Sequence, residues 1–104
     1  MNVLILVGSL HAGGGEKQAM TDANILSENN NVTIITYNDG PLRQLLNEKI
    51  QVKVLNHEGY PAKVFNLLKF VEKEKIEIIH AYLMGPLIQS AITGTFTSTK
   101  VIWH

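Results

Sequence analysis

Apolar residues fall into short β-branched runs separated by stretches with helical spacing. The runs at 3–7, 32–37, 77–82 and 100–104 are typical of strands buried in a parallel sheet. The alternating segment 51–56 is typical of a strand near a sheet edge. Between the runs, helices are predicted over Glu16–Ser27, Leu42–Glu48 (opened by Pro41), Pro61–Lys75 and roughly Pro86–Thr95. In the first helix one face is apolar, and it carries Ala19, Met20, Ala23 and Leu26.

The order of these elements decides the fold class. Strands and helices alternate from one end of the chain to the other with short connections. That order predicts an α/β fold: a Rossmann-like, doubly wound sheet of about five parallel strands with flanking helices. The 104 residues suit a single domain, 1–104, with a modest core.

Composition removes several classes of function. Nine basic and nine acidic residues cancel, so no net charge points to nucleic acid. The chain has no cysteine, which excludes disulfides and thiolate chemistry, and its histidines lack the spacing of metal ligands. No apolar run approaches the roughly 20 residues that span a bilayer. We therefore expect a cytoplasmic protein without a metal.

The loop "GSLHAGGGEKQ" holds three consecutive glycines between the first strand and the first helix. In doubly wound sheets, ligands bind beyond the carboxyl ends of the strands, and a helix N-terminus there favours phosphate. Neither the P-loop nor the dinucleotide fingerprint is present, and Glu16 in the first turn disfavours an anion. The residues alone leave a plain turn and a ligand-binding loop equally open.

The whole chain resembles the N-terminal domain of family-4 glycosyltransferases of the GT-B fold. The resemblance rests on "NVLILVGSL" with the Gly-Gly-x-Glu run at 13–16, then "VTIITYNDGPL", "VKVLN", "IEIIHAYL" and "KVIWH", in this order and spacing. It implies half of a GT-B fold, with a nucleotide-sugar donor bound by a second, C-terminal domain that has no counterpart in these residues.

The resemblance also implies site residues. Gly13, Gly14 and Gly15 match the loop whose amides approach the donor phosphates, and His104 matches a histidine that contacts the transferred sugar. His11, His80 and Tyr82 are expected at the acceptor and sugar cleft, where Tyr82 replaces a frequent histidine. By their positions alone, His11 also suits a solvated loop, and His80 a core histidine.

We therefore expect the acceptor-side domain of a retaining glycosyltransferase that uses a UDP- or GDP-sugar and no cofactor. Alone it is expected to be inactive, with its partner donor domain supplied in cis or in trans. The alternative is a stand-alone binding domain without catalysis that forms a homodimer. A nucleotide-binding oxidoreductase fragment is disfavoured by the missing fingerprint. Membrane contact through the aromatic, lysine-rich helix from Pro61 is less favoured than a core-facing role for that helix.

Overall fold

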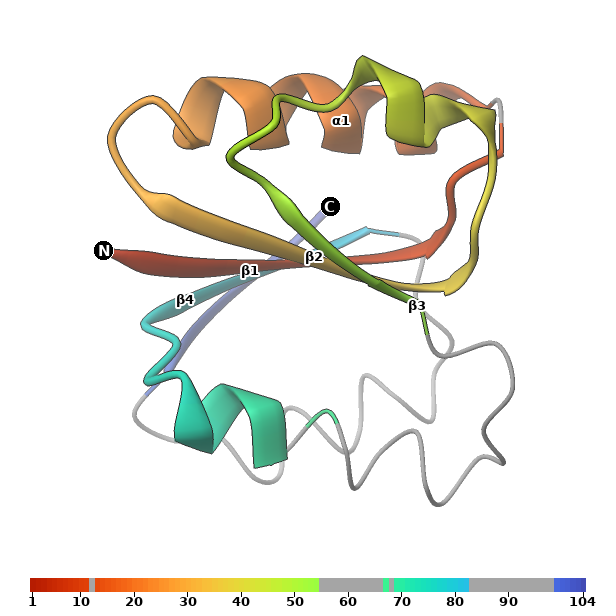
Figure 1. Cartoon of the computed structure of the whole chain (residues 1–104). Coiled ribbons are helices and arrows are strands. Elements are labelled where there is room, and N and C mark those ends of the chain that lie inside the picture. The colour runs from red at the N-terminus through yellow and green to blue at the C-terminus, as the bar shows by residue number, and fades with distance from the viewer. Residues whose placement is uncertain (12, 55–66, 68, 83–98) are drawn as a thin grey trace.

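The computed structural model describes residues 1–11, 13–54, 67, 69–82 and 99–104. Five parallel strands form one sheet in the order β3-β2-β1-β4-β5, and α1 lies on one face (Figure 1). The strands are β1 (Asn2–Ser9), β2 (Asn31–Asn38), β3 (Gln51–Val54), β4 (Ile78–Tyr82) and β5 (Lys100–Trp103). The helices include α1 (Gly14–Leu26) and the 3-10 helix η1 (Pro41–Leu45). The Rossmann-like, doubly wound α/β prediction is confirmed.

The sheet separates two apolar layers. On the α1 face, Val3, Ile5 and Val7 of β1 pack with Ala19 and other residues of α1. On the opposite face, Leu4 and Leu6 pack with Leu67 and Val71 from a short helix formed by residues 67 and 69–73 (Figure 1). Because successive side chains of a strand point to opposite faces, the unbroken apolar run of β1 serves both layers.

The predicted boundaries need small corrections. β1 extends beyond 3–7 to Asn2 and Ser9, and α1 begins at Gly14 rather than Glu16. The helix predicted over Leu42–Glu48 is instead the 3-10 turn of η1, which Pro41 opens. The Leu46 amide donates to the Arg43 carbonyl, three residues earlier, which is the 3-10 pattern. The segment of five residues is too short for regular α-helical bonding. The prediction over Pro86–Thr95 lies outside the described residues, as does the start of the helix predicted from Pro61.

The short helix of residues 67 and 69–73 ends two residues before its predicted end at Lys75. Lys75 adopts a left-handed conformation with φ of 52°, and the Ile76 amide donates to the Val71 carbonyl at 3.1 Å. This closure satisfies a terminal carbonyl and turns the chain toward β4. Ile76 is buried in the apolar layer on the face opposite α1, and this burial anchors the turn.

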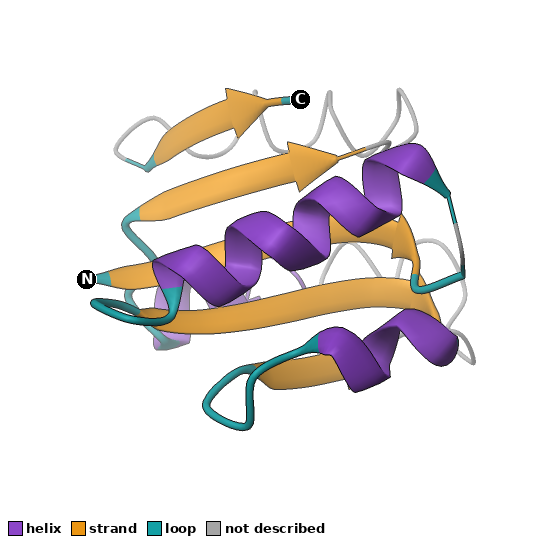
Figure 2. Ribbon diagram, turned by 90° about the horizontal axis from the view of Figure 1, so that it is seen from above, coloured by secondary structure: helices purple, strands orange, loops and turns teal. Residues whose placement is uncertain are grey.

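All five strands point in the same direction, so their carboxyl ends lie along one edge of the sheet (Figure 2). The chain winds from β1 to β2 and β3 on one side and places β4 and β5 on the other. The strand order therefore reverses between β1 and β4, the position at which open α/β sheets bind ligands. None of the helices in the described ranges combines the length and apolar character needed to cross a membrane.

Candidate functional site

Two histidines meet between β4 and β5: His80 is in the middle of β4, and His104 directly follows β5. His80 Nδ1 and His104 Nε2 are 2.9 Å apart, within hydrogen-bonding distance, although 24 positions separate the residues in the chain. The ring centroids lie 5.2 Å apart. The parallel register pairs His80 with Ile102, so His104 follows on the same face two positions later. The His104 amide also donates to the Ala81 carbonyl at 2.9 Å, which fixes the backbone there.

Tyr82 supports the histidine pair from the last position of β4. Its ring stacks on His104 with centroids 4.1 Å apart and an angle of 1° between the planes. Its hydroxyl donates to Asp22 Oδ2 of α1 at 2.5 Å, and the other oxygen of Asp22 accepts from Gln18 Nε2 at 2.9 Å. Asp22, His80, Tyr82 and His104 thus form one connected set, which we call the histidine cluster.

Burial and neighbouring charges shift two titrations in the histidine cluster. The pKa of His80 is lowered, first because burial disfavours the cation and second because His104 lies beside it; Asp22 acts in the opposite direction. The pKa of Tyr82 is strongly raised by burial, by its hydrogen bond to Asp22 and by the charge of that carboxylate. At neutral pH the cluster therefore favours a neutral His80 and keeps the Tyr82 hydroxyl as a donor.

The glycine loop reaches the sheet at the end of β1. Gly13 is extended, with φ of −166°, and its carbonyl accepts the first helical bond, from the Lys17 amide. A Cβ at Gly13 would overlap the Glu16 carboxylate, whereas a Cβ at Gly14 would have no other atom within 4 Å apart from neighbouring backbone. No glycine in the described part of the chain has a positive φ. Neither the backbone conformation nor the packing of this domain thus requires glycine at position 14.

The structure assembles the predicted site residues only in part. His80, Tyr82 and His104 come together in the histidine cluster, while Gly13, Gly14 and half-buried Gly15 lie at the start of α1. His11 is exposed, and its backbone lies next to Gly40, which follows β2 on the other side of β1. Among the predicted site residues, the structure thus groups His80, Tyr82 and His104 and leaves His11 apart from them.

Sequence reasoning missed Asp22. This residue sits beside the buried face of α1 and belongs to no motif. A signal was available, since Asp22 directly precedes Ala23 and comes three positions after Ala19, two small residues that bring the helix close to the sheet. Only the strand order, with β4 next to β1, shows that Tyr82 is its partner.

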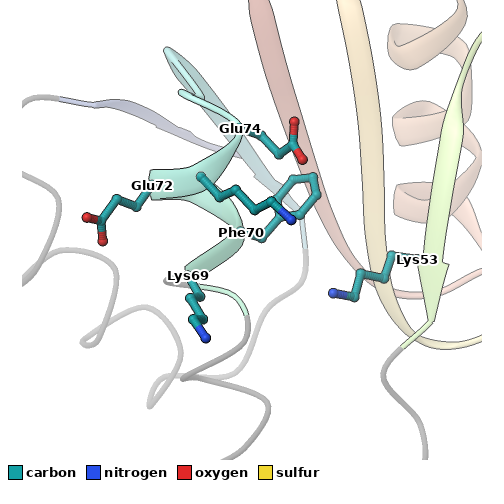
Figure 3. A pocket seen from close by; sticks show the side chains of 6 residues that line it. Lys53, Lys69, Phe70, Glu72 and Glu74 are labelled. Carbon is teal, nitrogen blue, oxygen red and sulfur yellow. The ribbon is translucent and has the colours of Figure 1, made fainter.

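Of the hollows on the surface of the described residues, two lie near features discussed above. A shallow one of about 240 Å³ adjoins the histidine cluster and is lined by Asp22, Ile25, Leu26 and His80. A larger one of about 760 Å³ lies between β3 and the helix of residues 67 and 69–73, lined by Lys53, Lys69, Phe70, Glu72, Lys73 and Glu74 (Figure 3). There the Lys53 ammonium is 5.7 Å from the Phe70 ring centroid, and Phe70 also packs against the core.

In the histidine cluster, His80 and His104 can share a proton through the bond between their ring nitrogens. Among the described residues, no group of three or more histidines and carboxylates is placed to hold a metal ion. Asp39, in the turn after β2, accepts from the Gly40 amide and from Arg43.

No family model matches the chain, and no curated protein matches it. The case for a function therefore rests on the residues of the chain and their geometry.

Proposed function

We propose that these residues form the acceptor-side domain of a retaining glycosyltransferase of the GT-B type, acting on a UDP- or GDP-sugar. The observation that carries the proposal is the histidine cluster, in which His80 from the middle of β4 meets Tyr82 at the end of β4 and His104 after β5. Two imidazoles can donate to or accept from sugar hydroxyls. The cluster also lies close to the reversal of strand order, where doubly wound sheets bind ligands.

The glycine loop adds an independent argument. Gly14 is exposed, is not in a left-handed conformation and faces open space where a side chain would stand. A glycine that the fold does not require suits a position where a ligand approaches the backbone. The free amides at the start of α1 would then face the donor phosphates and offset the charge that develops on the leaving group. The Glu16 carboxylate covers Gly13, so Gly14 offers the more open approach.

In this proposal His104 contacts the transferred sugar and the acceptor enters beside His80, while the buried Tyr82 supports the His104 ring. The second, donor-binding domain supplies the other wall of the cleft and most of the positive charge on the phosphates. The 104 residues alone are therefore expected to bind a nucleoside diphosphate weakly and to transfer no sugar.

Titration of the 15N-labelled domain with UDP or GDP tests the proposal. We expect amide shifts concentrated at Gly13, Gly14 and Gly15, with no comparable response to uridine, guanosine or NAD. Gly14→Ala should weaken the response, because its methyl group fits the fold but stands in the ligand's path. Absence of loop shifts at millimolar UDP and GDP would contradict the phosphate site. Sugar transfer by the isolated domain would contradict the half-site.

A second candidate is a binding domain that associates through β5 without catalysis. β5 is an edge strand of the described sheet, and its residue Trp103 is 42% exposed. An edge strand with an exposed aromatic residue is a ready surface for pairing. Light scattering over a range of concentrations separates the candidates: a dimer that persists without nucleotide, together with no UDP or GDP response, favours this one.

A further inference from the structure

We propose that Asp22 is a positioning residue for His104, acting through the hydroxyl and the ring of Tyr82. The contacts run from the Asp22 carboxylate to the Tyr82 hydroxyl, from the Tyr82 ring to the His104 ring, and from His104 to His80. The role toward a sugar rests on the proposed function. The effect on His104 itself does not depend on any ligand.

Asp22 is a fixed acceptor. It belongs to the middle of α1, whose buried residues Ala19, Met20 and Ala23 hold the helix against the sheet. Both carboxylate oxygens are engaged, Oδ1 with Gln18 one turn earlier and Oδ2 with Tyr82. A carboxylate held at both oxygens by a packed helix has little freedom to move, so the position of its partner hydroxyl is defined.

Tyr82 transmits that position to His104. Its side chain is only 3% exposed, so the ring is confined by packing, and the bond to Asp22 defines where its hydroxyl end lies. Because the pKa of Tyr82 is raised, its hydroxyl keeps its proton well above neutral pH and remains a hydrogen-bond donor there. The nearly parallel stack then defines the plane of the His104 ring, with 1° between the two rings.

His104 needs such support because it follows a short edge strand and is itself exposed. Its ring plane is set by Tyr82, and its Nε2 is engaged with His80 Nδ1. The bond links the tautomers of the two rings, because one of the two nitrogens must donate while the other accepts. Within the described part of the chain, this leaves Nδ1 as the His104 nitrogen available to a ligand, with a defined direction.

The charged and titratable groups around the pair come from three elements. Asp22 approaches from α1, Tyr82 lies two positions from His80 on β4, and His104 follows β5. Asp22 thus acts on the pair both through Tyr82 and by its charge, which opposes the lowering of the His80 pKa. The first effect concerns the His104 ring and the second the His80 proton, so they can be measured separately.

The test uses the 104-residue chain with 15N- and 13C-labelled histidine, observed by NMR without ligand. In the unsubstituted chain we expect His104 ring protons shifted upfield by the Tyr82 ring. Asp22→Ala and Tyr82→Phe should each change that upfield shift, because the hydroxyl end of the ring at position 82 is no longer held. Thr21→Ala is the matched control: it removes a side-chain bond to the Lys17 carbonyl on the same helix, leaves both bonds of Asp22 in place, and should leave the His104 signals unchanged.

The double variant decides the route. If Asp22 acts through the hydroxyl, D22A/Y82F gives the same His104 signals as Y82F alone. The proposal is overturned if D22A changes the His104 signals as much in the Y82F background as in the unsubstituted chain. It is also overturned if D22A folds and leaves the His104 signals unchanged. Should D22A not fold, Y82F decides alone, and unchanged His104 signals in it overturn the proposal. None of these signals requires a donor sugar, so failure here and failure of nucleotide binding are distinct results.

Discussion

His80 shows at the scale of one residue how the fold selects a protonation state. An unperturbed histidine has a pKa near 6.5, and burial together with the neighbouring His104 moves that of His80 lower. Asp22 opposes this shift without reversing it. His80 therefore resists protonation in the folded state, which preserves the shared hydrogen bond with His104 under conditions where a free histidine begins to charge.

This environment predicts a pH dependence of stability. The unfolded chain takes up a proton at His80 as the pH falls through about 6.5, before the folded chain does, so protonation favours unfolding. The contribution of His80 is thus fully present above that pH and is lost below it. We expect the free energy of unfolding from urea titrations to decline between about pH 7.5 and 5.5, and less steeply in His80→Gln. The other histidines are common to both proteins, so an equal or steeper decline in the variant would contradict the prediction.

At the scale of elements, two glycines at helix starts, Gly14 and Gly40, differ in the space around them. Gly40 precedes η1, and a Cβ there would lie 2.6 Å from the Leu10 backbone carbonyl oxygen, which already accepts from the Leu42 amide. Gly40 is extended, with φ of −171°, so the requirement is one of space rather than of backbone conformation. This close approach joins the loop after β1 to the loop after β2. Gly14, at the start of α1, has no such neighbour.

We therefore expect opposite effects of the same substitution at the two positions. Gly40→Ala should lower the free energy of unfolding by about 1–3 kcal/mol, because backbone on both sides must shift. Gly14→Ala should leave it unchanged or raise it by about 0.4–1 kcal/mol, because alanine has less freedom in the unfolded chain. Urea denaturation monitored by circular dichroism measures both. Equal losses at the two positions would show that the space around Gly14 is not open.

Elements were also where sequence reasoning was most accurate. The apolar face of α1 holds Ala19, Met20 and Ala23 as predicted; four strands lie at the apolar runs, and β3 lies in the alternating segment. Spacing predicts these well because each element must bury one face, whatever its partner. It failed for η1, where a five-residue segment is too short for its periodicity to separate α-helical from 3-10 bonding.

At the scale of the whole molecule, β1 joins the two apolar layers. Ile5 and Leu6 are adjacent and fully buried, yet Ile5 belongs to the α1 face and Leu6 to the opposite face. Because one central strand carries both, loss of either layer removes support from the entire sheet. The two layers are therefore expected to unfold together rather than in sequence.

Ile5→Ala and Leu6→Ala test this coupling as a pair. Each should lower the free energy of unfolding by about 2–5 kcal/mol through lost burial and the cavity that remains. Trp103, the single tryptophan, reports on β5, and circular dichroism reports on all elements. The transitions seen by the two probes should coincide in both variants. Ile25→Ala, at an exposed site on α1, is the control and should change stability by less than about 0.5 kcal/mol. Separate transitions would indicate that the layers unfold independently.

The sequence by itself determined which segments become strands or helices and which residues they bury, because these properties follow from local spacing. Tertiary structure alone decided the histidine cluster. Asp22 and Tyr82 are 60 positions apart, and His80 and His104 are 24 apart, so no local pattern links them. Their meeting depends on β4 pairing with β1 beneath α1 and on the register of β5. Several strand orders would satisfy the local patterns, and burial of the apolar residues of the whole sheet decides among them. The order that results brings four separate polar residues into one cluster.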